Sequence, residues 1–180
     1  MKKKIAIIGS GIAGLTIANL FKQNSNFEVM VYEKEKMLSL NQGYGIQLAP
    51  NSISILNKIG FSKIDNDNFF NPSKLSFYSR DNKKICDLNL SNLNSDKDKY
   101  TTLKRSVLIE FLKSNLFTNN IRFGKEVKKI SKLKEKLLIN FKDNTNDLVD
   151  FIIVSDGIFS NTKSIIENKN INPIYNGSVA

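Results

Sequence analysis

A glycine-rich segment lies between an apolar run and a helix-like segment almost at the start of the chain. Residues 7–21 read IIGSGIAGLTIANLF, and Gly9, Gly11 and Gly14 fit the pattern G-x-G-x-x-G. Glycine loses more backbone entropy on folding than any other residue, so three glycines in six positions indicate a steric requirement. Between a strand and a helix, this pattern is typical of a turn that binds the diphosphate of a dinucleotide.

The three glycines have separate tasks in such a turn. Gly9 permits the tight turn, Gly11 lets a pyrophosphate approach the backbone, and Gly14 lets the helix pack closely on the strand. The N-terminus of the helix offers unpaired N–H groups and a partial positive charge to the phosphates. We therefore expect this motif, with Ala13 inside it, to contact a cofactor.

An acidic residue follows at the spacing that dinucleotide binding requires. Residues 27–33, FEVMVYE, alternate as a strand does and end in Glu33, which comes about 20 residues after the last glycine. A carboxylate at this position accepts hydrogen bonds from ribose hydroxyls, and we place the adjacent Lys34 in the same site. With a strand at 4–8 and a helix at 14–22, the segment predicts a β-α-β unit and a parallel sheet.

The rest of the chain continues this mixed pattern. A glycine-marked loop and a short strand precede a helix that begins near Pro50 and closes at Gly60. Two β-like runs within 72–92, on either side of residues 80–83, predict a hairpin. After a helix at 104–117, three short strands form a β-meander; the last of them, DLVDFIIVSDG, is apolar enough to lie inside a sheet. The fold class is thus α/β, a Rossmann-type domain with a parallel sheet, a β-hairpin excursion and a β-meander.

Composition narrows the class of protein. The chain has 180 residues, of which 41% are hydrophobic and 24% charged, as in ordinary globular domains. No apolar run approaches the roughly 20 residues needed to span a bilayer, and Cys86 has no partner for an internal disulfide, so we expect a cytoplasmic protein. The chain lacks histidine, which excludes Ser-His-Asp catalysis and histidine-ligated metals.

The net charge is +10, which raises the question of an anionic partner. The lysines are scattered rather than gathered on one segment, apart from KEVKKISKLKEK, and they are frequent in evident loops. We therefore expect no nucleic-acid partner, and at most a weak association with acidic membrane surfaces or with phosphates. The oligomeric state is not indicated.

Four landmarks together resemble one family. The glycine motif is followed by GYGIQLAPNSISILNKIG, then KRSVLIEFL, which is similar to an R-x-x-L-x-x-x-L helix, then FIIVSDGIFSNTK, which is similar to a D-G motif. Their order and spacing over residues 4–163 resemble the N-terminal half of flavoprotein aromatic hydroxylases. These are FAD monooxygenases of the p-hydroxybenzoate hydroxylase type, which include ubiquinone-biosynthesis hydroxylase-like proteins.

The resemblance implies roles for several residues. Arg105 would contact a phosphate or the polar edge of the flavin, although by itself it could be a solvated surface arginine. Asp156 and Gly157 would reach the ribityl and pyrophosphate part of FAD and help the reduced nicotinamide cofactor to dock. Their plain alternative is a tight turn after a strand.

Weaker correspondences and two departures complete the comparison. The resemblance places Gly43 and Gly45 beside the isoalloxazine ring and the backbone of Val127 at the adenine. Lys163 stands where the family's D-G motif has arginine, and Ser155 where it has another small residue. Lysine keeps the charge but loses the planar fork, which weakens contacts to the phosphates of a nicotinamide cofactor.

The resemblance also implies a domain division and an incomplete chain. Residues 1–170 would form the FAD-binding domain, with residues 72–100 as a hairpin excursion toward the substrate side. Residues 171–180 would be the truncated start of a substrate domain. Because the family has a later G-D motif that completes the cofactor site, we expect the chain alone to hold FAD weakly or not at all.

The activity implied is hydroxylation of an aromatic or phenolic small molecule with FAD, NAD(P)H and O2, by a chain present here as an N-terminal fragment. The sequence assigns no catalytic side chain and no metal, since the cofactor performs the difficult chemistry. Two alternatives remain open. One is an FAD-dependent reductase or dehydrogenase on the same scaffold, and the other is a truncated, non-catalytic nucleotide-binding module.

Overall fold

The computed structural model describes residues 2–38, 44–175 and 177. The chain divides into two compact units. The first unit contains residues 1–39 and 112–180, and the second contains residues 40–111. Gly43, expected beside the flavin, lies outside the described residues.

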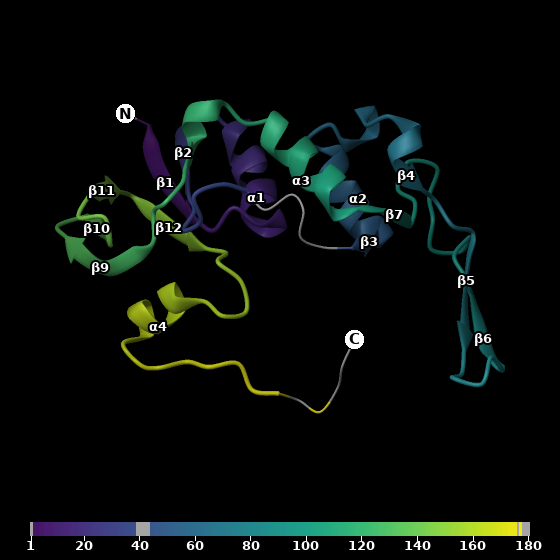
Figure 1. Cartoon of the computed structure of the whole chain (residues 1–180). Coiled ribbons are helices and arrows are strands. Elements are labelled where there is room, and N and C mark those ends of the chain that lie inside the picture. Colours follow the sequence, from purple (N-terminus) through teal and green to yellow (C-terminus); the bar gives the residue numbers. More distant parts are fainter. Residues whose placement is uncertain (1, 39–43, 176, 178–180) are drawn as a thin grey trace. The chain divides into compact units, whose positions relative to one another are not determined.

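A four-stranded parallel sheet forms the centre of the first unit. Its strands, in the order β12-β1-β2-β8, are β1 (Lys3–Ile8), β2 (Phe27–Tyr32), β8 (Ile121–Arg122) and β12 (Phe151–Val154). Helix α1 (Ile12–Lys22) connects β1 to β2 and lies against both strands (Figure 1). The predicted β-α-β unit is confirmed. The helix begins at Ile12 rather than at residue 14, because Gly11 keeps an extended backbone and serves as the N-cap.

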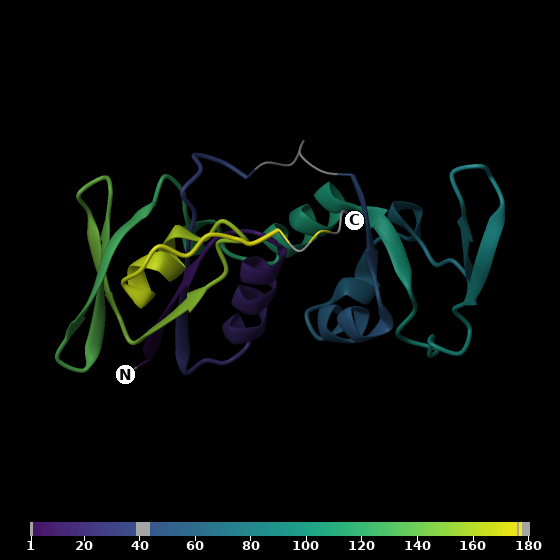
Figure 2. The same ribbon diagram turned by 90° about the horizontal axis from the view of Figure 1, so that it is seen from below.

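A second, antiparallel sheet belongs to the same unit. It consists of β9 (Val127–Leu133), β10 (Lys136–Phe141) and β11 (Asn146–Val149), with β10 in the middle. Helix α4 (Asn161–Glu167) contacts β9 and is seen beside the meander in Figure 2. The predicted meander is confirmed, but its strands begin and end at other residues than expected.

The expectation of one last strand in DLVDFIIVSDG is wrong, because the chain changes sheet at Asp150. Residues before Asp150 pair antiparallel with β10 as β11, and residues after it pair parallel with β1 as β12. The Asp150 N–H donates to the Lys4 carbonyl at 2.9 Å, and its carboxylate accepts from the Lys4 N–H at 2.7 Å. Likewise, the expected strand from residue 121 is divided into β8 and β9, with Gly124 between them at φ +69°.

One hydrophobic core joins the two sheets of this unit. It combines buried side chains of the parallel sheet, Ala6, Ile8, Met30 and Tyr32, with those of the meander, Val127, Ile139, Phe141 and Val149. The Tyr32 and Phe141 rings lie 4.9 Å apart between centroids. The meander thus packs on the strand that precedes the glycine motif and on the strand that precedes Glu33.

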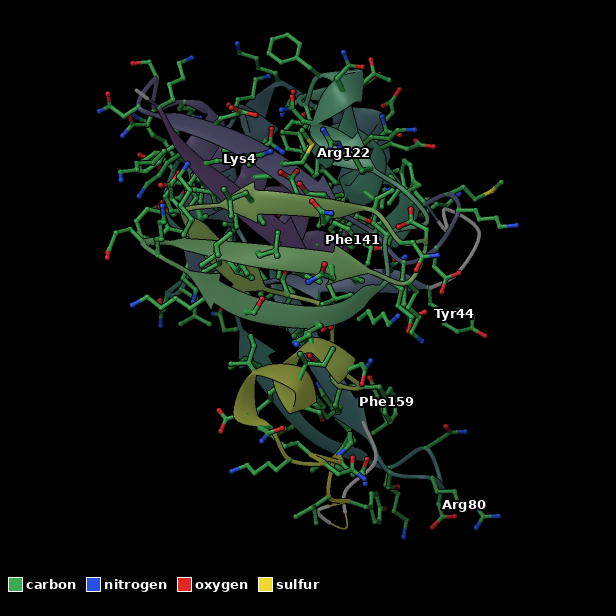
Figure 3. All side chains as sticks on the ribbon, turned by 90° about the vertical axis from the view of Figure 1, so that its left-hand side faces the viewer. Lys4, Tyr44, Arg80, Arg122, Phe141 and Phe159 are labelled. Carbon is green, nitrogen blue, oxygen red and sulfur yellow. The ribbon has the colours of Figure 1, made fainter. Side chains whose placement is uncertain are left out.

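A polar cluster at Asp147 ties the edge of the meander to the parallel sheet. The Asp147 carboxylate accepts hydrogen bonds from the Tyr32 hydroxyl and the Lys4 ammonium, the latter at 2.6 Å, and lies 3.3 Å from the Arg122 guanidinium. Lys4 and Arg122 are labelled beside the meander in Figure 3. Burial acts to raise the pKa of Asp147, but the hydrogen bonds from Lys4 and Tyr32 outweigh it and lower the pKa.

The second unit has a small antiparallel sheet and a separate hairpin. The sheet has the order β3-β7-β4, and the hairpin pairs β5 with β6. The elements that begin in this unit are β3 (Gly45–Leu48), α2 (Pro50–Asn57), β4 (Phe69–Phe70), β5 (Lys74–Tyr78), β6 (Lys84–Asn89), β7 (Thr101–Lys104) and α3 (Arg105–Ser114). Three short 3-10 turns, η1 (Phe61–Lys63), η2 (Asn66–Asn68) and, in the first unit, η3 (Thr118–Asn120), complete the chain.

The local predictions for this part of the chain hold in outline. Pro50 occupies the first turn of α2, where its missing N–H costs nothing, and Gly60 follows the helix at φ +93°. The hairpin turns at residues 80–83, with Asn82 in the left-handed region at φ +58°. The helix expected over 104–117 is shorter, Arg105–Ser114. Within the described residues, no helix has the length and apolar character needed to cross a membrane.

We expect Asp147→Asn to lower the free energy of unfolding by about 2 kcal/mol at neutral pH, because two cations and a buried phenol lose their shared anion. Since the pKa of Asp147 lies below its ordinary value of 3.8, this difference should be present above pH 3.8 and fade as the pH falls through the lowered pKa. Urea unfolding of both proteins at several pH values measures it.

Asp87→Asn is the control, because Asp87 forms an ion pair with Lys84 on the exposed hairpin. We expect no measurable change for it. Equal effects of the two substitutions would contradict a specific role for the Asp147 cluster.

Candidate functional site

The glycine turn is packed against the turn that follows β12. Gly9 has φ +101°, and a Cβ added there would lie 2.5 Å from the Ser155 carbonyl oxygen. A Cβ added at Gly14 would lie 2.0 Å from the Gly9 carbonyl oxygen. Both distances are far below contact distance, so the protein's own main chain requires glycine at these two positions.

Gly11 differs from the other two glycines of the motif. A Cβ added at Gly11 would meet no heavy atom of the described residues within 4 Å. Gly11 is the N-cap of α1, and no side chain in the described part of the chain caps the helix there. It lines a cavity of about 230 Å³. The bare backbone of Gly11 and the positive end of α1 therefore face space that a ligand can fill.

The walls of this cavity come from four places at the carboxyl end of the parallel sheet. They are the end of β1, the end of β2, the start of β9 and the turn between β12 and α4. Ligands of open parallel sheets bind at this edge. The sequence-predicted residues that line the cavity are Gly9, Gly11, Glu33, Lys34, Val127, Asp156 and Gly157.

Glu33 is held by three hydrogen bonds from the protein itself. Its Oε2 accepts from the Ser10 N–H at 2.8 Å and from the Ser10 hydroxyl at 2.6 Å, and its Oε1 accepts from the Glu35 N–H at 3.0 Å. Burial acts to raise the pKa of Glu33, but these hydrogen bonds outweigh it and lower the pKa below its ordinary value. At neutral pH the group is therefore a carboxylate and accepts hydrogen bonds.

Asp156 carries another carboxylate of the cavity, whose lining also includes Glu126. Its Oδ2 accepts from the Thr162 N–H at 3.3 Å, while its buried Oδ1 has no partner among the described residues. A buried carboxylate oxygen without a donor is costly, so this atom is suited to a donor from a ligand. Beside it, Gly157 adopts φ +88°, and the Ser155 hydroxyl donates to the Ile8 carbonyl at 2.9 Å.

A second cavity, of about 450 Å³, adjoins the same turn. It shares residues 155–157 with the first cavity, and Ala13 and Lys163 are part of its lining. Ala13 is thus separated from the cavity of Glu33 by the turn after β12. Two adjoining cavities across this turn provide room for an elongated ligand.

The remaining predicted residues lie elsewhere. Gly14 packs against the Gly9 carbonyl and is not among the residues that line the cavity. Arg105 and Gly45 belong to the second unit, where the Arg105 N–H donates to the Tyr44 carbonyl at 3.3 Å and Gly45 pairs with Lys104.

Sequence reasoning missed the contact between Ser10 and Glu33. The available signal was a hydrogen-bonding side chain at the first variable position of the glycine motif. Thr162, which is buried and donates its N–H to Asp156, gave no signal in the sequence.

Comparison with known proteins adds the family context. Residues 7–42 match the family described as NAD(P)-binding Rossmann-like domain. The chain is 27% identical to 6-hydroxynicotinate 3-monooxygenase of Pseudomonas fluorescens, an alignment that covers 98% of this chain and 46% of that protein. It is 26% identical to 3-amino-4-hydroxybenzoate 2-monooxygenase of Streptomyces cremeus, over 87% of this chain and 40% of that protein.

Solved structures show the same fold. The structure of 2,6-dihydroxypyridine-3-hydroxylase from Arthrobacter nicotinovorans matches 98% of this chain with a TM-score of 0.78 at 20% identity, and 42% of that protein is covered. HpxO of Klebsiella pneumoniae, solved in complex with FAD and uric acid, matches 90% of the chain with a TM-score of 0.77 at 23% identity, and 41% of it is covered.

The chain spans less than half the length of these relatives. The sequence relatives named above are monooxygenases, and 2,6-dihydroxypyridine-3-hydroxylase shares the fold over that length. The resemblance to FAD-dependent aromatic hydroxylases that the four sequence landmarks predict is thereby confirmed.

Proposed function

We propose that this chain forms the FAD-binding part of a monooxygenase that hydroxylates an aromatic or phenolic small molecule with NAD(P)H and O2. The observation that carries the proposal is the unobstructed Gly11 backbone beside the cavity of Glu33. The relatives named above act on hydroxynicotinate and aminohydroxybenzoate, small aromatic acids that indicate the substrate class.

The residues around the two cavities fit the parts of FAD. The diphosphate would lie at Gly11 and the N-terminus of α1, where N–H groups and the helix dipole favour an anion. Glu33 would accept a hydrogen bond from the ribose, and the main chain of Val127 would border the adenine. Asp156, with its partnerless Oδ1, would accept a donor from the ribityl and pyrophosphate part.

The charges near the cavity are also consistent with this placement. Lys34 and Lys125 contribute two cations to the lining. Lys125 already forms an ion pair with Asp143 at 2.5 Å, which leaves Lys34 as the better candidate for a phosphate or ribose contact. For Arg105 and Gly45, in the second unit, a flavin contact rests on the resemblance alone.

When bound, FAD would supply the redox chemistry that couples NAD(P)H oxidation to oxygen insertion. The chain's own contribution is to bind and orient. The packed Gly9–Ser155 contact fixes the turn, and Glu33 sets the position of the ribose. Ile8, Tyr32 and Val127 belong to the core and also line the cavity. No side chain of this chain is assigned to proton transfer.

The experiment that tests cofactor binding uses ADP and FAD with the chain as it is. We expect millimolar ADP to shift the backbone amide NMR signals of residues 9–14 and of Glu33. Because the chain alone is expected to hold FAD weakly or not at all, any competition by FAD for these signals should require a large excess. Absence of any shift with ADP would refute the proposal. Oxygen-dependent hydroxylation with NAD(P)H separates a monooxygenase from a reductase, which would oxidise NAD(P)H without inserting oxygen.

Two glycine substitutions separate ligand binding from folding. Gly11→Ala should leave the fold intact, with a loss of no more than about 1 kcal/mol at the N-cap, and should abolish the ADP shifts because the methyl group fills the diphosphate position. Gly14→Ala should cost about 3 kcal/mol, because its methyl group collides with the Gly9 carbonyl.

Thermal unfolding followed by circular dichroism measures stability, and the ADP titration measures binding. A folded Gly11→Ala protein with unchanged ADP affinity would show that the diphosphate does not lie against this glycine.

A further inference from the structure

We propose that the Ser10 hydroxyl positions the Glu33 carboxylate for a ribose hydroxyl, and so makes Ser10 a determinant of adenosine-ribose affinity. Ser10 is the residue between the first two glycines of the motif G-x-G-x-x-G. The motif itself does not specify the side chain at this position. The inference rests on the proposed function and deepens it, because it adds a positioning residue to the same cavity.

The contact between Ser10 and Glu33 is buried and consists of two hydrogen bonds. Ser10 is only 3% exposed, and both its N–H and its hydroxyl donate to the same oxygen, Oε2 of Glu33, at 2.8 and 2.6 Å. The main chain of Glu33 is fixed as well, since its N–H donates to the Arg122 carbonyl at 2.9 Å and its carbonyl accepts from the Lys125 N–H at 2.7 Å. With the backbone held, the Ser10 bonds select the side-chain rotamer.

The Glu33 carboxylate has an acceptor position left for a ligand after its hydrogen bonds to the described residues. A carboxylate accepts about four hydrogen bonds, two at each oxygen. Ser10 fills both positions of Oε2, and the Glu35 N–H fills one position of Oε1. The described residues leave one acceptor position, on the oxygen that Ser10 does not touch. The serine therefore directs the ribose hydroxyl to Oε1 and fixes that oxygen before the ligand arrives.

Other charged groups share the cavity with Glu33, namely Lys34, Lys125, Glu126 and Asp156. Lys125 is paired with Asp143 and Glu126 with Lys142, each at 2.5 Å, so Lys34 is the cation that acts on Glu33. Burial raises the pKa of Glu33, and the donors Glu35 and Ser10 lower it by more. Loss of the Ser10 hydroxyl should accordingly raise the pKa of Glu33 toward its ordinary value of 4.5.

The test is the ADP affinity of Ser10→Ala, measured by NMR titration at neutral pH. We expect the Kd for ADP to rise about tenfold, the effect of one hydrogen bond to a charged group. Ser76→Ala is the matched control, because the Ser76 hydroxyl donates to the Asp87 carboxylate at 2.7 Å on the exposed hairpin. Its ADP affinity should equal that of the wild type. Thermal unfolding establishes that each variant is folded.

Two further readouts distinguish positioning from a structural role. The ADP affinity of Ser10→Ala should decline at a higher pH than that of the wild type as the pH is lowered, since its Glu33 takes up a proton sooner. In a Glu33→Ala background, Ser10→Ala should change the Kd less than twofold, because the group through which it acts is gone.

The outcomes separate this inference from the proposed function. If the wild type binds ADP and Ser10→Ala binds it equally well, the positioning role is refuted while the proposed function stands. An equal loss in the Glu33→Ala background, or an unshifted pH profile, refutes it too. If the wild type does not bind ADP at all, both proposals fall.

Discussion

The close approach of two main-chain turns determines the rest of the first unit. The turn after β1 lies so close to the turn after β12 that Gly9 cannot carry a Cβ, and α1 lies so close to the Gly9 carbonyl that Gly14 cannot carry one either. This contact sets the distance between α1 and the end of β12, and hence the shape of both cavities. Because the partners are carbonyl oxygens and Cα atoms rather than flexible side chains, no rotamer change can relieve a substitution there.

The three glycines of the motif G-x-G-x-x-G are needed for two different reasons. Gly9 and Gly14 are needed because a Cβ would collide with the protein's own atoms, whereas the absence of a side chain at Gly11 leaves space for a ligand. Glu33 and Asp156 then place one ionised and one partly unsatisfied carboxyl group on the rim. The solved hydroxylases share this fold over less than half of their own length.

Much of this arrangement could be predicted from the sequence, because local patterns encode it. The glycine spacing, the alternation before Glu33 and the hairpin turn at residues 80–83 depend on residues close in the chain. The change of sheet at Asp150 could not be predicted, since it depends on the hydrogen bonds of Asp150 with the carbonyl and N–H of Lys4, which lies 146 positions earlier in the chain. The Ser10–Glu33 bond was likewise hidden, because it joins the turn after β1 to the residue that follows β2, 23 positions further along the chain.

The position of β12 beside β1 has a consequence for biosynthesis. The first strand of the sheet leaves the ribosome early, but its neighbour on one side is encoded about 150 positions later. Until then, an apolar edge of β1 has no partner, and the turn at Gly9 has nothing to pack against. The nascent chain must therefore keep that edge from aggregating while the entire second unit is made, and the cavity beside Gly11 is among the last features to be completed.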